Sequence, residues 1–155
     1  MEISARLEYG VRALLELARH WEQDPDLWMK ADHIAGAQGI PLTFLESILG
    51  HLRQRGLVSS QRGAAGGYRL AGAPEQVTLA DIVRALEGPL AGVRGQRPED
   101  VTYPGAAAAL PEVWVALRGA MRQVLEGLTL ADVLTGTFPE PVAAILQQPG
   151  VRQRR

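Results

Sequence analysis

Residues 39–70 read GIPLTFLESILGHLRQRGLVSSQRGAAGGYRL. In the first half of this stretch, leucines and one isoleucine recur at helical spacing, which predicts a helix over residues 42–54. Residues 57–61 and 68–70 are each typical of a short β-strand, and the glycine pair Gly66-Gly67 between them supports positive φ in a turn. The stretch therefore predicts a helix followed by a β-hairpin.

The residues that precede this stretch predict two more helices. Apolar residues recur at helical spacing over residues 3–18, with arginine and glutamate between them. A short helix is expected over residues 31–38, where Gly39 would end it. A tight turn joins this helix to the one over residues 42–54, which is the arrangement of a helix-turn-helix. With the hairpin that follows, the unit is predicted to be a winged helix-turn-helix in a mainly α fold.

The residues after the hairpin predict a second helical unit. Thr78 and Asp81 have the spacing of a capping box, which begins a helix that Gly88-Pro89 would end. Residues 88–109 are rich in glycine, proline and alanine, so a loop is expected there, and a long helix begins near Pro111. We divide the chain into a winged helix-turn-helix domain (residues 1–76), a linker helix, cysteine-free loop and dimerisation helix (77–135), and a tail expected to be mobile (136–155).

The long C-terminal helix carries a continuous apolar stripe. A domain of this size cannot bury such a stripe by itself, so we expect the helix to pair with its mate in a homodimer. The residues assigned to this dimerisation surface are Leu110, Val113, Trp114, Leu117, Met121, Val124 and Leu128.

The composition excludes several kinds of site. The 155 residues include no cysteine, which excludes disulfides, thiolate nucleophiles and cysteine-ligated clusters. The histidines His20, His33 and His51 fall in three different helical elements, and neither a Gly-x4-Gly-Lys-Ser/Thr loop nor a His-Glu-x2-His motif occurs. We therefore expect no enzyme, no metal site and no cofactor. No run of about 18 apolar residues and no signal pattern is present, so a cytoplasmic protein without membrane contact is expected.

The helix over residues 42–54 has a face suited to the major groove of DNA. The side opposite the leucines is small and polar, and threonine or glutamate there can contact base edges. Arg53 lies at the edge of this side and is included among the candidate DNA-binding residues. Residues 41–70 hold four arginines and one glutamate, a local charge of +3 in a chain whose net charge is −1. Such local charge favours phosphate binding, and Arg62 at the hairpin tip could reach a narrow minor groove.

Each of these residues has a second interpretation. Phe44 is as well suited to the core as to a DNA contact. Glu46 could pair with Arg53 or cap its own helix, and an arginine beside a glycine, as at Arg62, is typical of a solvated turn. Winged helices also bind proteins, so a protein-interaction module without sequence-specific DNA binding is the alternative function.

Four motifs together resemble a known family. They are YGVRALL at 9–15, GIPLTFLESIL at 39–49, SSQRGAAGGYRL at 59–70 and TLADIVRALEG at 78–88. They look like the bacterial winged-helix repressors that include the iron–sulfur cluster regulator IscR, the nitric-oxide sensor NsrR and the cysteine-metabolism repressor CymR. The resemblance covers residues 3–88 and continues more weakly to about residue 135.

The resemblance implies a homodimeric repressor that binds a pseudo-palindromic operator in double-stranded DNA. It implies that Thr43, Phe44 and Glu46 are contacts of the recognition helix. It also implies that Ser60, Arg62 and Gly63 are contacts of the wing.

This chain departs from the family pattern at three places. Pro41 replaces a serine or similar residue at the helix start, which removes a hydroxyl contact and a cap. Ala64-Ala65 replaces the Pro-Gly that is common in the wing. Sensor members carry three cysteines in the loop that corresponds to residues 89–110, where this chain has none. No cluster is therefore expected, and the signal stays open between a small molecule, a protein effector and none.

Overall fold

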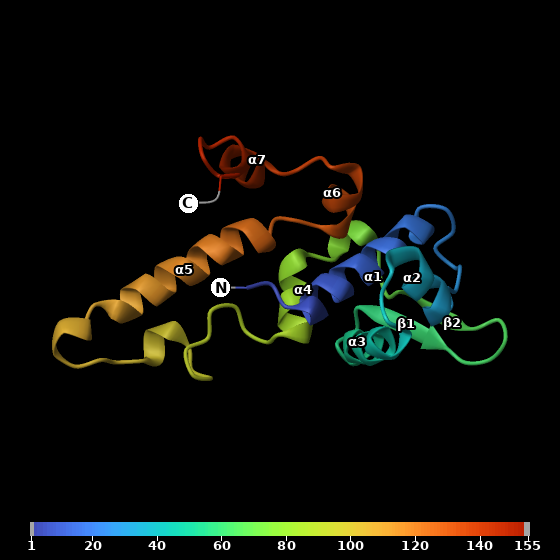
Figure 1. Cartoon of the computed structure of the whole chain (residues 1–155), viewed down its shortest axis with the longest axis horizontal. Coiled ribbons are helices and arrows are strands. Elements are labelled where there is room, and N and C mark those ends of the chain that lie inside the picture. The colour runs from blue at the N-terminus through green and yellow to red at the C-terminus, as the bar shows by residue number, and fades with distance from the viewer. Residues whose placement is uncertain (1, 154–155) are drawn as a thin grey trace.

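The computed structural model describes residues 2–153 as an assembly of helices with one small β-hairpin (Figure 1). The mainly helical fold with a hairpin that the sequence predicts is confirmed. The helices are α1 (Ala5–Trp21), α2 (Ala31–Gln38), α3 (Leu42–Gln54), α4 (Leu79–Leu86), α5 (Leu110–Leu125), α6 (Leu130–Thr135) and α7 (Glu140–Leu146). The strands are β1 (Val58–Gln61) and β2 (Gly67–Leu70), and short 3₁₀ helices are η1 (Pro74–Gln76), η2 (Pro98–Asp100) and η3 (Gly105–Ala107).

Helix α1 lies at the centre of one core, which is formed by the predicted domain of residues 1–76 together with α4 and α6. It begins at Ser4, whose hydroxyl oxygen accepts a hydrogen bond from the backbone N–H of Leu7, and it packs against α2, α3, α4 and α6. Its glycine, Gly10, lies close to α4: a Cβ there would be 2.3 Å from Cδ1 of Leu86, so the Leu86 side chain would have to shift. One core, which includes the fully buried Leu14 and Leu45, joins these helices to the hairpin.

The helix-turn-helix has the bounds that its sequence pattern predicts. Helix α2 ends at Gly39, which has φ +61, and α3 follows directly after Pro41. The leucines of α3 are not all buried. Leu42 is 42% exposed, because it lies in the first turn, beyond the edge of the core that Leu45 and Ile48 enter.

The wing is an antiparallel hairpin in which Val58 pairs with Leu70 and Gln61 with Gly67. Outside the hairpin, Met29 and Tyr68 exchange two backbone hydrogen bonds of 2.8 Å, which attaches the segment before α2 to β2. Gly67 has φ +155, and a Cβ on it would lie 2.4 Å from the Met29 carbonyl oxygen. The predicted positive φ is not found at Gly66, where the constraint is space: a Cβ would lie 2.1 Å from the carbonyl oxygen of Gln61.

The second unit begins at a capping box. The Thr78 side chain accepts from the N–H of Asp81, whose carboxylate accepts from the N–H of Thr78, as predicted. Thr129 and Asp132 repeat the arrangement at the start of α6. Between these two points, the loop over residues 88–109 and helix α5 extend away from the N-terminal domain as an arm (Figure 1). Helix α6 then returns to α1 and η1, where Leu130 is fully buried.

The tail contains a helix that was not predicted from the sequence. Helix α7 lies within residues 136–155 and packs against α5. Its prolines do not break it, because Pro139 is the N-cap residue and Pro141 lies in the first turn, where a missing N–H costs nothing. Mobility of the tail stays a prediction, and its last two residues lie outside the described chain.

Candidate nucleic-acid interface

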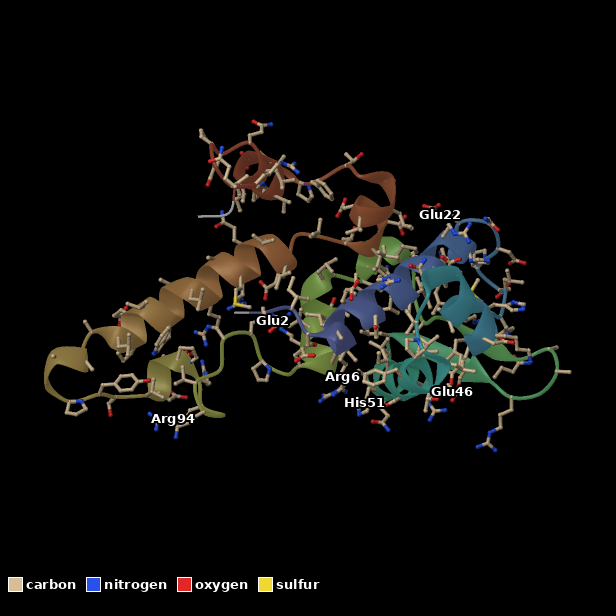
Figure 2. The ribbon with its side chains drawn as sticks, viewed as in Figure 1. Glu2, Arg6, Glu22, Glu46, His51 and Arg94 are labelled. Carbon is tan, nitrogen blue, oxygen red and sulfur yellow. The ribbon has the colours of Figure 1, made fainter. Side chains whose placement is uncertain are left out.

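The N-terminal half of α3 presents its candidate contacts to solvent. Thr43 and Glu46 are exposed, and Figure 2 shows Glu46 projecting from the surface of this helix. Within residues 2–153, Glu46 has no ion pair with Arg53 and no hydrogen bond to its own helix. An unpaired carboxylate at this position is free to meet an external partner.

Phe44 lies on the surface. Its side chain is 55% exposed, and its ring meets that of Tyr9 in an edge-to-face contact with centroids 6.2 Å apart. The contact holds the ring beside α1 and leaves more than half of it accessible. Phe44 is therefore a surface residue whose ring packs against Tyr9, and not a core residue.

The C-terminal half of α3 is connected to the wing. Arg53 Nη1 donates a hydrogen bond of 3.2 Å to the hydroxyl oxygen of Ser60 on β1. The bond joins two of the predicted DNA contacts, one on the recognition helix and one on the hairpin. Since both side chains are exposed, the bond lies at the surface, where it links α3 to the wing.

The wing tip is the turn between β1 and β2. Gly63 adopts φ +98, and Arg62 beside it is exposed. In the part of the chain that the structure describes, the Arg62 side chain forms no ion pair or hydrogen bond. The guanidinium is therefore available to an anion outside the chain.

Two cationic residues near this surface were missed by the sequence reasoning. Lys30, the only lysine in the sequence, precedes α2 and donates a hydrogen bond of 2.9 Å from Nζ to the carbonyl oxygen of Gly63. Arg6 of α1 lines a cavity of about 190 Å³ with Thr43, Phe44 and His51, and Figure 2 shows Arg6 and His51 near one another at this surface. No sequence pattern could indicate either residue, since both reach α3 or the wing only through the tertiary fold.

The local charge of +3 over residues 41–70 is not gathered on one surface. Arg69 donates to Asp26 at 2.9 Å and lies 4.3 Å from the ring centroid of Trp28, so its charge is compensated outside the interface. Arg55 lines a different cavity with Arg84 of α4. Of the four arginines in residues 41–70, Arg53 and Arg62 therefore remain at the candidate interface.

Among residues 2–153, histidine, aspartate and glutamate form no group of three or more that could hold a metal ion. Over the same residues, no helix combines the length and the apolar character needed to cross a membrane.

Comparison with known proteins identifies the family. The profile of the Rrf2 family, described as iron-dependent transcriptional regulators, matches residues 3–136. A protein from Mycobacterium tuberculosis named as an HTH-type transcriptional regulator is 47% identical over 145 residues, covering 94% of this chain and 88% of the relative. CymR of Bacillus subtilis, an HTH-type transcriptional regulator, is 35% identical over 143 residues, covering 92% of this chain and 96% of the relative.

Solved structures give the same result. The structure of CymR, the global cysteine regulator of B. subtilis, superimposes with a TM-score of 0.72 at 34% identity, covering 89% of this chain and 99% of that one. IscR of T. potens superimposes with a TM-score of 0.69 at 33% identity, covering 89% of both chains. These matches confirm the winged helix-turn-helix fold and the predicted resemblance. The family consists of DNA-binding regulators and not of enzymes, and the chain belongs to the Rrf2 family of transcriptional regulators.

Proposed function

We propose that the protein is a homodimeric repressor that binds a pseudo-palindromic operator through α3 and the wing. The observation that carries the proposal is the hydrogen bond between Arg53 and Ser60, which joins the exposed side of α3 to the exposed hairpin. In this proposal, Thr43, Phe44 and Glu46 read bases in the major groove. The wing residues Arg62 and Gly63 lie against the DNA backbone or the minor groove.

The state of α5 in the single chain supports a homodimer. This helix of 16 residues has no buried residue, and Val113 and Leu117 are 54% and 37% exposed. The indole Nε1 of Trp114 is shielded from solvent and has no hydrogen-bond partner within residues 2–153. An amphipathic helix is stable when its apolar side is covered, and a second copy of the helix covers it by twofold symmetry. Two α3 helices related by that axis would read two half-sites of a palindrome.

An iron–sulfur cluster does not fit the residues present. The chain has no cysteine, and the acidic and aromatic residues of the loop are Glu99, Asp100 and Tyr103. The Glu99 carboxylate is already bonded to Arg97 and Arg118. Carboxylates suit hard cations and not a sulfide cluster. We therefore propose regulation without a cluster, and with it a cytoplasmic location, where a bacterial chromosome lies.

Repression is proposed as the mode of regulation, because a dimer seated on a promoter excludes the polymerase by occupancy. The test is to crosslink the protein to DNA in cells, recover and sequence the fragments, and then transcribe one recovered promoter in vitro. We expect a shared inverted repeat in the fragments and a fall in transcript as protein is added. Fragments without a common sequence, or a rise in transcript, would contradict the proposal.

A second measurement tests the absence of a cluster. Protein purified without oxygen should be colourless and should contain no acid-labile sulfide and no stoichiometric iron. A brown preparation that contains sulfide would show that other ligands replace cysteine.

A further inference from the structure

Five arginine side chains meet at one open cavity of about 570 Å³, on the side of the chain where the arm joins the N-terminal domain. They come from four parts of the chain: Arg55 follows α3, Arg84 lies on α4, Arg97 precedes η2, and Arg118 and Arg122 lie on α5. The rest of the lining is Gly88, Pro89, Leu90 and Glu99. The cavity is therefore lined both by a residue at the end of the recognition helix and by residues of the proposed dimerisation helix.

Two carboxylates lie among these arginines, and each is shared by two of them. Glu99 is 2.7 Å from Arg118 Nη1 and 2.5 Å from Arg97 Nη2. Glu126 pairs with Arg84 and, at 2.9 Å, with Arg122 Nε. The hydrogen bond from Arg118 lowers the pKa of Glu99 to about 2, and bonds from Arg84 and Arg122 lower the pKa of Glu126. Both carboxylates are thus ionised at neutral pH.

The positive charge at the cavity exceeds what the chain itself compensates. Five arginines face the two carboxylates, which leaves a net charge of +3. Among the described residues, Arg55 forms no ion pair and no side-chain hydrogen bond. Asp81 lines an adjoining cavity of about 200 Å³ with Arg55 and Arg84, but its carboxylate already accepts bonds from the N–H and hydroxyl of Thr78. Glu87 lines a second adjoining cavity, of about 350 Å³, with Arg97 and Arg118, and its carboxylate accepts a hydrogen bond from the Ser4 hydroxyl. Counting both Asp81 and Glu87 still leaves a charge of +1.

We propose that this cavity binds a small organic polyanion that carries at least two phosphate or carboxylate groups. Guanidinium groups bind both kinds of group with two parallel hydrogen bonds, and several of them around one hollow favour a multiply charged ligand. The volume accommodates a molecule of metabolite size. Such a ligand joins Arg55, directly after α3, to Arg118 and Arg122 on α5. The ligand is therefore suited to be the effector of the regulator. This regulatory role rests on the proposed DNA binding, whereas the existence of the anion site does not.

The test is calorimetric titration of the whole protein, without DNA, with pyrophosphate, with citrate and with glucose as a neutral control. We expect one of the anions to bind and glucose not to bind. Tighter binding of pyrophosphate assigns the ligand to the phosphates, and tighter binding of citrate assigns it to the carboxylates. Failure of both anions to bind at millimolar concentration would overturn the proposal, and would do so independently of whether the protein binds DNA.

Variants locate the binding. R55Q and R118Q should each weaken anion binding by about tenfold, the effect expected for one charge-assisted hydrogen bond. R94Q is the matched control, because Arg94 lies in the same loop region and is exposed but does not line the cavity. Arg55 has no structural partner to lose, so R55Q remains informative if R118Q unfolds. An equal loss with R94Q would mean that the anion binds the surface at large, which overturns the site.

DNA phosphate is the other polyanion that could occupy these arginines. We expect R55Q to bind a scrambled duplex like the unaltered protein, whereas R62Q loses affinity. If R55Q loses as much duplex affinity as R62Q, the cavity is part of the DNA interface and the proposal of a small ligand is wrong.

Discussion

Lys30 contacts the wing tip: its Nζ donates a hydrogen bond of 2.9 Å to the carbonyl oxygen of Gly63, 33 residues further along the chain. Lys30 is also the N-cap residue of α2, and its neighbour Met29 shares two backbone hydrogen bonds with Tyr68 of β2. The segment that leads into α2 is thus attached to the wing at two places, the tip and β2. Arg62 is next to Gly63, so we expect this attachment to affect how Arg62 meets DNA.

Replacing Lys30 with methionine keeps the apolar stem and removes the donor. We expect DNA affinity to fall by about three- to tenfold, the range for one exposed hydrogen bond from a charged group. Lys30→Arg, which keeps a donor and the charge, is the control and should lose less. Fluorescence anisotropy on a labelled duplex measures both. Equal affinities of the methionine variant and the unaltered protein would show that the wing tip does not need this bond.

Arg62→Ala should weaken binding to every DNA sequence. The side chain is exposed at a glycine-flanked tip, so its interaction is with phosphate or the minor groove and not with a particular base pair. The slope of log affinity against log salt should fall by about one, as for the loss of one phosphate contact. Titrations at several salt concentrations measure it, and an unchanged slope would mean that Arg62 does not neutralise DNA charge.

Glu46→Ala should relax sequence discrimination. A carboxylate near DNA is repelled by phosphates, so its benefit lies in accepting a bond from a base or in rejecting wrong bases. We expect a loss of roughly 1–3 kcal/mol of discrimination at one base pair, with affinity for scrambled DNA equal or higher. The variant is titrated with operator and scrambled duplexes. A proportional loss on both would show that Glu46 has a structural role.

Gly50→Ala should change the stability of the protein and its affinity for DNA in opposite directions. A Cβ at this position of α3 would meet no atom within 4 Å, so the chain itself does not require glycine there. Alanine should raise the free energy of unfolding by up to about 1 kcal/mol. Because the position lies on the side of α3 proposed to enter DNA, we expect operator affinity to fall at the same time. A more stable variant with unchanged affinity would remove Gly50 from the interface.

Leu117→Asp should weaken the dimer. Leu117 is 37% exposed in the single chain, on a helix with no buried residue, so a charge there leaves the fold of one chain intact and opposes pairing. Light scattering should give twice the 16.7 kDa of one chain for the unaltered protein and a lower mass for the variant. Glu112→Gln, at an exposed polar position on the same helix, is the control. A folded monomer for the unaltered protein at micromolar concentration would refute the dimer.

Local signals in the sequence predicted most of the N-terminal fold. The bounds of α2 and α3 follow from Gly39, Pro41 and the spacing of the leucines. The capping box at Thr78 is visible because its two partners are three residues apart, and the structure contains both of its hydrogen bonds. Such features need no knowledge of the rest of the chain, which is why periodicity and capping residues are sufficient for them.

Features that depend on distant contacts were not predictable in the same way. The bonds of Lys30 to Gly63 and of Arg69 to Asp26 join segments far apart in sequence. The bond to Asp26 removes the charge of Arg69 from the interface, and the bond to Gly63 adds Lys30 to it. Helix α7 lies in the tail for which the sequence predicts only mobility, and its prolines Pro139 and Pro141 stand at the N-cap and in the first turn, where proline is tolerated.

The most direct measurement is the affinity of the unaltered protein for a captured operator and for a scrambled duplex of the same length, at roughly 50 and 200 mM salt. We expect the operator to bind at least about a thousandfold more tightly than the scrambled duplex, and both affinities to fall as salt is raised. Equal affinity for the two duplexes at each salt concentration would contradict sequence-specific recognition by α3 and the wing.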